Sequence, residues 1–191
     1  VNKKDVYNAL ELSVNKNHHV VNLIDYRVDL ALRVGALPDS SLLATRVGYI
    51  RKITCASPDY LKQRGTPQSF KELVSHDCIT HESNLVISPW SFFDGKENHS
   101  INVHSRLTVT TAEAAIDASV QGLGITRVLS YQIAHLPAES LEVILKDVEP
   151  EPLPVSLLYP NSRVLPQKLR AFIDFTAPRL KAKLASIERR D

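Results

Sequence analysis

The stretch Cys55-Ala56-Ser57-Pro58-Asp59-Tyr60-Leu61 decides the fold class, because it joins a strand directly to a helix. The apolar residues of 46–56 predict a strand that runs into this stretch. Ser57 is a preferred N-cap residue, and Pro58 suits the first helical position, where its missing N–H costs nothing. A strand that passes at once into a capped helix is typical of α/β proteins.

The same alternation is predicted on the N-terminal side of this stretch. Residues 10–14 alternate apolar and polar, which predicts a strand buried on one face. Residues 17–26 carry apolar side chains at helical spacing, and 28–34 form a second strand. Strand, helix and strand in this order predict a parallel crossover unit with right-handed connection.

On the C-terminal side, the pattern first predicts a small helix and a hairpin. Thr66-Pro67-Gln68-Ser69-Phe70 opens a helix that is expected to reach about Val74, and 78–81 form a short strand. Residues 90–93 and 101–104 flank turn residues and predict a hairpin.

Further along, a strand at 107–109 leads into Thr110 and Glu113, which we expect to form a capping box for a helix over 114–121. Another strand is predicted at 125–129.

The chain closes with a strand and a long helix. Residues 155–159 predict the strand, and Pro166 starts the helix. Pro178 is expected to kink or interrupt this helix, and the charged tail 181–191 is expected to fray.

Alternating strands and capped helices make this an α/β chain of two lobes. The strand before Ser57 and the strand at 155–159 can each cross from one lobe to the other. We expect residues 1–54 and 158–191 to form the first lobe and 55–157 the second.

The composition is that of an ordinary globular protein. The 191 residues are 43% hydrophobic and 23% charged, and the net charge of +2 provides no basic field for nucleic acid. The two cysteines indicate buried thiols in a reducing, cytoplasmic setting. The apolar runs are too short to cross a bilayer. The chain contains no methionine, so position 1 is not expected to be the natural start.

Motifs for catalysis or metal binding are missing from the pattern. None of the seven histidines has carboxylates or cysteines at a recognised zinc spacing. A Gly-x-Ser-x-Gly elbow is absent, and Gly122-Leu123-Gly124 follows a helix instead of preceding one, unlike a phosphate loop. We therefore predict no enzyme activity, no metal and no cofactor.

Three strand ends carry polar residues that run into helices. They are Asn15-Lys16, Ala56-Ser57 and Thr110-Thr111. Free N–H groups and the positive end of a helix dipole favour an anionic or polar small ligand at such places. Each is also explained as an ordinary helix cap.

Several segments, taken together, resemble the effector-binding domain of LysR-type transcriptional regulators. The resemblance covers roughly residues 7 to 180 and is carried by 28–35, 55–61, 122–125, 152–155, 158–160 and 166–175.

The resemblance implies a type 2 periplasmic-binding-protein-like fold, with two Rossmann-like lobes around a cleft that binds small metabolites or aromatic acids; together with the polar helix ends, this leads us to expect a small, anionic metabolite. It also implies dimers or tetramers formed through this domain, with helix 20–24 and the first helix of the second lobe as the contact surfaces. The implied cleft residues are Asn15, Lys16, Arg33, Gly35, Ala56 and Ser57, and from the second lobe His81, Thr110, Thr111, Ile125, Thr126 and Arg127.

The chain departs from the family pattern in two ways. The N-terminal winged helix-turn-helix is absent from this sequence, so DNA contact is expected only through a domain outside it. The family's effector domain also opens with a strand and a helix before the strand at 10–14, and we expect the first lobe to lack them here.

Two rival functions remain open. One is a solute-binding component of a transporter, which shares the fold. The other is an enzyme on the same fold, which would need clustered titratable groups in the cleft, and the sequence shows none.

Overall fold

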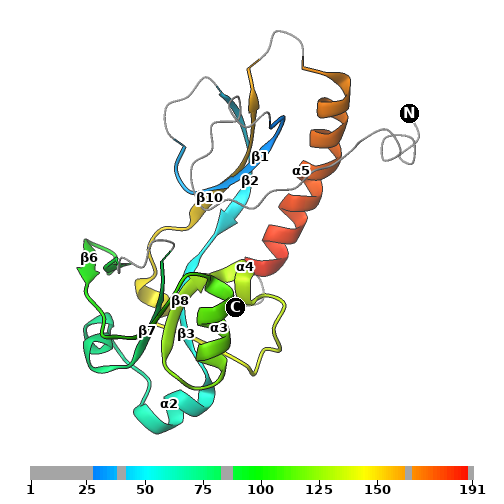
Figure 1. The fold of residues 1–191 in the computed structure, drawn as a ribbon. Coiled ribbons are helices and arrows are strands. Elements are labelled where there is room, and N and C mark those ends of the chain that lie inside the picture. Colours follow the sequence, from blue (N-terminus) through cyan, green and yellow to red (C-terminus); the bar gives the residue numbers. More distant parts are fainter. Residues whose placement is uncertain (1–27, 38–41, 83–87, 162–164, 189–191) are drawn as a thin grey trace. The chain divides into compact units, whose positions relative to one another are not determined.

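The computed structural model describes residues 28–37, 42–82, 88–161 and 165–188. The chain divides into two compact units, the first comprising residues 1–49 and 153–186 and the second 50–152 and 187–191. The first unit thus ends at 49 and resumes at 153, where the sequence led us to expect 54 and 158. Figure 1 shows strands and helices in both units, so the predicted α/β class is confirmed.

The first unit contains a three-stranded sheet in the order β1-β10-β2 and a long helix, α5. Strand β1 (Ala31–Val34) runs antiparallel to β10 (Leu153–Pro160), and β2 spans Leu42–Ile50. The predicted strands at 28–34 and 155–159 are therefore confirmed. The strand at 10–14 and the helix at 17–26 lie outside the described residues.

The strand expected over residues 46–56 is two strands, β2 and β3 (Lys52–Ala56). They meet at Arg51, whose carbonyl accepts a hydrogen bond from the Ser130 backbone N–H at 2.9 Å. The two strands belong to different sheets, which a continuous apolar pattern in the sequence does not reveal.

Helix α5 (Gln167–Glu188) corrects two expectations about the C-terminus. Pro178 lies inside the helix and does not end it, and the described part of the tail is helical up to Glu188 and does not fray. The physical reason is burial: an apolar stripe at helical spacing continues beyond the proline and offsets its missing hydrogen bond. The stripe consists of Ile173, Ala177, Leu180, Leu184 and Ile187.

The second unit is built on a five-stranded sheet in the order β7-β4-β8-β3-β9. Strand β4 runs parallel to β7 and β8, whereas β3 runs antiparallel to β8 and β9. The further strands of this sheet are β4 (Cys78–His81), β7 (Ser105–Val109), β8 (Ile125–Leu129) and β9 (Glu142–Ile144).

Helices and a hairpin cover this sheet. The hairpin pairs β5 (Trp90–Phe93) with β6 (Asn98–Ile101), three residues earlier than the second strand we expected. The helices are α2 (Pro58–Arg64), α3 (Ala112–Val120), α4 (Ser130–Ile133) and the 3₁₀ helices η1 (Phe70–Ser75) and η2 (Lys146–Val148). The helix predicted over residues 66–74 is therefore the later 3₁₀ turn η1.

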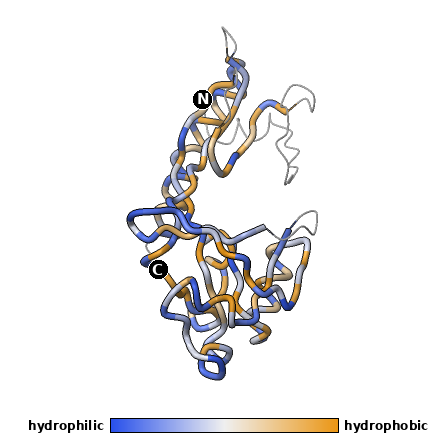
Figure 2. The backbone as a smooth tube through the Cα atoms, turned by 90° about the vertical axis from the view of Figure 1, so that its left-hand side faces the viewer, coloured by the Kyte–Doolittle hydropathy of each residue, from blue (hydrophilic) through white to orange (hydrophobic). Residues whose placement is uncertain are grey.

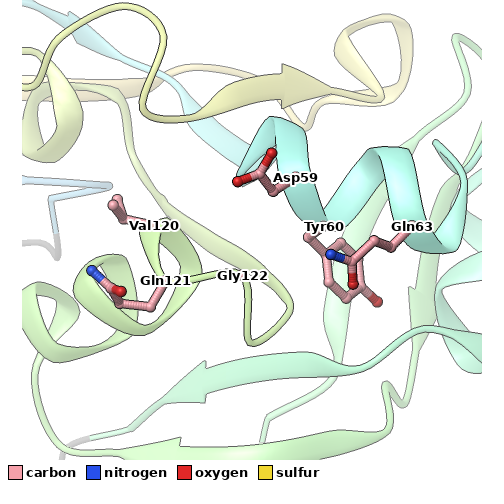
Figure 3. A pocket seen from close by; sticks show the side chains of 6 residues that line it. All are labelled: Asp59, Tyr60, Gln63, Val120, Gln121 and Gly122. Atoms are coloured by element: carbon pink, nitrogen blue, oxygen red, sulfur yellow. The ribbon is translucent and has the colours of Figure 1, made fainter.

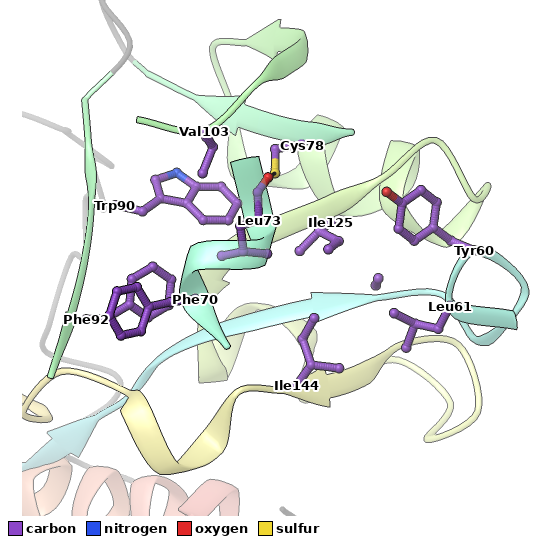
Figure 4. Close-up of a cluster of buried hydrophobic side chains, with 11 residues drawn as sticks. Tyr60, Leu61, Phe70, Leu73, Cys78, Trp90, Phe92, Val103, Ile125 and Ile144 are labelled. Carbon is purple, nitrogen blue, oxygen red and sulfur yellow. Dashed lines mark hydrogen bonds between the residues drawn. The ribbon is translucent and has the colours of Figure 1, made fainter. Parts of the chain in front are cut away.

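The two faces of the sheet have separate cores. On one face, Ile53, Cys55 and Val128 pack against Ala112 and Ile116 of α3. On the other face, a larger cluster packs beneath η1 and the hairpin, as Figure 4 shows; its aromatic members are Tyr60, Phe70, Trp90 and Phe92. Hydrophobic residues gather inside this unit, and hydrophilic residues lie along its outer loops (Figure 2).

Gly124 allows β8 to start close to the segment before β4. A Cβ atom built on Gly124 would lie 2.3 Å from the backbone oxygen of Asp77, which is a severe clash. That oxygen accepts the backbone N–H of Ile125 at 2.9 Å. Only glycine permits this approach. The role of Gly124 is therefore to let two segments of the sheet lie close together.

Across the described ranges, the structure contains no helix both long and apolar enough to cross a membrane.

Candidate functional site

The carboxyl ends of β4 and β7 bring three of the predicted site residues together. His81 ends β4 and pairs with Val109, the last residue of the parallel strand β7. Thr110 and Thr111 follow β7 directly and are exposed, and His81 is half-buried. In α/β sheets, ligands bind beyond the carboxyl ends of parallel strands, so this edge is a candidate binding site.

The same edge holds the N-terminus of α3, with a correction to its cap. The residue that caps the helix is Thr111, whose Oγ1 accepts a hydrogen bond from the Ala114 backbone N–H at 3.2 Å, and not Thr110. The hydroxyl of Thr111 is therefore engaged in the cap. Thr110 lies one residue outside the helix, where its side chain is exposed to solvent beside a positive helix end.

Arg127 lies in β8 and is almost fully buried, with 4% of its surface exposed. Its Nη2 donates to the backbone oxygen of Ser91, and its guanidinium carbon lies 4.5 Å from the centre of the Phe92 ring. Among the described residues, its Nε and Nη1 have no hydrogen-bond partner. Burial lowers the pKa of Arg127 to about 10, against an opposing effect of Glu149.

The neighbours of Arg127 in β8 face the packed interior. Ile125 has no exposed surface and belongs to the cluster of Figure 4. Thr126 is also fully buried, and its Oγ1 donates to the backbone oxygen of Ile79 at 3.1 Å. Neither side chain reaches the carboxyl edge where Thr110 lies.

Ala56 and Ser57 lie at the opposite end of the same sheet. Strand β3 is antiparallel to β8, so its end, Cys55 and Ala56, pairs with the start of β8 and with β9. Ser57 caps α2, accepting the Tyr60 backbone N–H at 3.3 Å, as its sequence predicts. The structure therefore separates Ala56 and Ser57 from His81 and the two threonines.

A pocket of about 300 Å³ lies at this opposite end, between α2 and the end of α3 (Figure 3). None of the predicted site residues lines it. Its lining side chains are Asp59, Tyr60, Gln63, Val120, Gln121 and Gly122.

The predicted site residues of the first unit are only partly described. Arg33 pairs with Ser156 across β1 and β10, and its Nε is buried without a hydrogen-bond partner among the described residues. Gly35 has a φ of 103°, which favours glycine, and its N–H donates to the Pro154 backbone oxygen at 2.9 Å. Asn15 and Lys16 lie outside the described residues.

The sequence reasoning missed Lys52 and Thr54 as neighbours of Arg127. Thr54 pairs directly with Arg127, and Lys52 lies two residues earlier on the same face of β3. The sequence does contain a pattern that indicates them: the polar Lys52 and Thr54 alternate with the apolar Ile53 and Cys55. This alternation indicates a strand with one polar face.

Both cysteine thiols lie in apolar surroundings. Burial raises the pKa of both Cys55 and Cys78 to about 12, which suppresses the reactive thiolate. Within the ranges that the structure describes, no group of three or more histidine, cysteine, aspartate or glutamate residues could hold a metal ion.

Comparisons with known proteins identify one family. The profile of the LysR substrate binding domain family matches residues 7–181. The HTH-type transcriptional regulator YhjC of Escherichia coli strain K12, itself uncharacterised, is 30% identical over 179 residues, which cover 92% of this chain and 60% of YhjC. This chain thus spans about three fifths of that curated relative.

Solved structures of LysR-type regulators also resemble this chain. The regulatory domain of CrgA, a LysR-type transcriptional regulator from Neisseria meningitidis, superposes with a TM-score of 0.77 at 29% identity, covering 93% of this chain and 87% of that domain. Full-length AphB, a virulence activator of Vibrio cholerae, superposes with a TM-score of 0.73 at 27% identity, covering 91% of this chain and 62% of AphB. The predicted periplasmic-binding-protein-like fold of two lobes is confirmed by these matches, and the chain belongs to the LysR substrate-binding-domain family.

Proposed function

We propose that this chain is the effector-sensing domain of a bacterial transcription regulator of the LysR type. It binds a small, anionic metabolite between its lobes and passes the signal to an N-terminal DNA-binding domain outside this sequence. The protein acts in the cytoplasm as a dimer or tetramer formed through this domain, and it catalyses no reaction.

One observation in the structure carries the proposal of a ligand site. The carboxyl ends of β4 and β7 place His81, Thr110 and the N-terminus of α3 at one edge of the second unit's sheet. Backbone N–H groups and the helix dipole favour a negatively charged group there. The match to other LysR-type regulators supports a sensor over the transporter component that the sequence left open, since YhjC and CrgA are described as transcription regulators.

The proposal is tested by a thermal-shift screen of metabolites on this chain. A ligand that binds only the folded state raises the melting temperature, because binding stabilises that state by mass action. We expect small organic acids to give the largest shifts. Anionic, neutral and cationic compounds should be screened alike at millimolar concentration, and a screen without any hit contradicts the proposal.

A pair of variants then localises the binding. Thr110→Val removes the exposed hydroxyl at the site and should weaken binding by about five-fold, the worth of one hydrogen bond. Thr66→Val, which changes an exposed threonine in the loop before η1, is the matched control and should bind as the parent does. Equal affinity of both variants removes Thr110 from the site.

A further inference from the structure

The sheet of the second unit carries a row of polar side chains on the face that lies opposite α3. Thr80 pairs with Thr108, and Thr54 pairs with Arg127. The parallel register of Ile79 with Thr126 places Thr80 next to Arg127. The row therefore crosses four adjacent strands beneath a predominantly apolar cluster, where unpaired polar groups are costly.

The two halves of this row differ in how their polar atoms are satisfied. The outer half of the row consists of Thr80 and Thr108, and the inner half of Thr54 and Arg127. The hydroxyl of Thr80 lies 2.7 Å from that of Ser105 and 3.1 Å from that of Thr108, so the hydroxyls of the outer half hydrogen-bond to one another. In the inner half, Arg127 has two nitrogens without an acceptor among the described residues. Thr54, which pairs with Arg127 across β3 and β8, is itself buried, with 2% of its surface exposed.

The charges around the inner half favour an anion. Burial, and then the positive charge of Arg127, lower the pKa of Lys52, while the negative charge of Glu82 raises it. Glu149, the carboxylate that acts on Arg127, lies 3.3 Å from the guanidinium of Arg51 in an ion pair. Because no carboxylate among the described residues hydrogen-bonds to Nε or Nη1, burial of this guanidinium carries a desolvation cost that a bound anion would offset.

From these observations we infer that Arg127 and Thr54 form a buried subsite that holds a carboxylate group of the effector. This inference rests on the proposed function, and it specifies the effector as an organic carboxylate. The guanidinium Nε–H and Nη1–H groups and the Thr54 hydroxyl donate to the carboxylate oxygens, and Lys52 adds positive charge. The apolar cover, with Phe92 against the guanidinium, favours a carboxylate over a doubly charged phosphate, because desolvating the phosphate costs more.

The hairpin β5–β6 controls access to this subsite. Ser91 accepts a hydrogen bond from Arg127 through its backbone oxygen, and the Phe92 ring packs on the guanidinium. Because Nε and Nη1 are shielded from solvent, the hairpin must move off the sheet for a carboxylate to reach them. Binding at Arg127 is therefore coupled to the position of the hairpin.

The inference is tested by following the Nε–H signal of Arg127 in the nitrogen–proton NMR spectrum of the whole chain. The signal is identified by its loss in Arg127→Lys. Acetate, succinate and benzoate are titrated separately, with chloride and phosphate at matched ionic strength. We expect a saturable shift of the Arg127 signal with at least one carboxylate and none with chloride or phosphate.

Thr54→Val, which is nearly isosteric, keeps the test valid if Arg127→Lys fails to fold. It should weaken carboxylate binding by about five-fold through the lost hydrogen bond. Thr108→Val is the control on the same face, because its hydroxyl is engaged with Thr80 and Ser105 outside the subsite. We expect the affinity of Thr108→Val to stay within about two-fold of the parent.

The outcomes separate this inference from the proposed function. An unmoved Arg127 signal overturns the inference, even if a metabolite binds and Thr110→Val weakens it, a result that leaves the proposed function standing. Equal shifts with chloride or phosphate also overturn it, since they show a general anion site. Unchanged affinity in Thr54→Val removes Thr54 from the subsite.

Discussion

The N-cap residues of α2 and α3 show what capping rules predict from sequence and what they do not. Ser57 was expected to cap α2 and does so through its Oγ. Thr110 was expected to cap α3, but Thr111 is the cap, with extended backbone at φ −128° and ψ 147°. Two adjacent threonines are equally good caps by composition. Which of them caps depends on where the backbone turns out of β7.

A second residue-scale feature is the buried histidine of the second unit. The hydroxyl of Tyr60 lies 3.1 Å from Nδ1 of His76 and accepts the Asp77 backbone N–H at 3.0 Å. Burial, and then the positive charge of Arg64, lower the pKa of His76, while Glu72 and Asp77 oppose them. The folded state therefore binds a proton at His76 more weakly than the unfolded chain does.

This difference predicts a loss of stability in acid. The contribution of His76 is fully present above the unfolded pKa of about 6.5 and is lost as the pH falls through its lower folded pKa. Urea unfolding at about pH 7.5 and about pH 5 should show a smaller drop in unfolding free energy for His76→Gln than for the parent. His104→Gln, which changes an exposed histidine, is the control and should drop as the parent does. Equal drops in all three proteins contradict the prediction.

At the scale of elements, burial overrides local propensity. Pro178 and the charged tail predicted that the C-terminal helix would be interrupted, yet α5 continues to Glu188. Its apolar stripe extends to Leu184 and Ile187, both buried. Leu184 lies directly over Gly48 of β2, where a Cβ atom would come within 2.8 Å of its Cδ1. Packing of this stripe keeps the last turns of the helix in place.

Removing this contact should therefore weaken the first unit. Leu184→Ala is expected to lower the unfolding free energy by about 2–4 kcal/mol, through lost burial and the cavity left over Gly48. Lys183→Ala changes the exposed neighbouring residue in the same turn and should change it by less than about 0.5 kcal/mol. Urea denaturation of the two variants measures both values. A cost for Leu184→Ala as small as that of the control would show that the stripe does not hold the tail.

At the scale of the whole molecule, the chain is divided between two units with their own sheets. Leu157 of β10 is buried in the first, and Leu73 of η1 in the second. Regions with separate cores open to solvent with separate local free energies. Destabilisation of one core is therefore expected to act mainly within its own unit.

Amide hydrogen exchange tests this expectation with a matched pair of variants. Leu73→Ala should speed exchange in β4 and β8 by about ten-fold or more, because a buried leucine contributes about 2–5 kcal/mol, and should affect β1 and β10 less. Leu157→Ala should produce the reverse pattern. Uniform acceleration across the chain in both variants would show one cooperative unit instead of two.

The sequence by itself determined the α/β class, most of the strands, the Ser57 cap and, through its resemblance, the family. These features are local, since alternation, capping and glycine positions are properties of neighbouring residues. Only the tertiary structure decided which polar residues meet. The opposite directions of β3 and β4 put Ala56 and Ser57 at one end of the sheet and His81 and Thr110 at the other, and pairing with Thr54 beneath a hairpin buries Arg127. Strand direction and cover are set by contacts between distant segments, which no local pattern encodes.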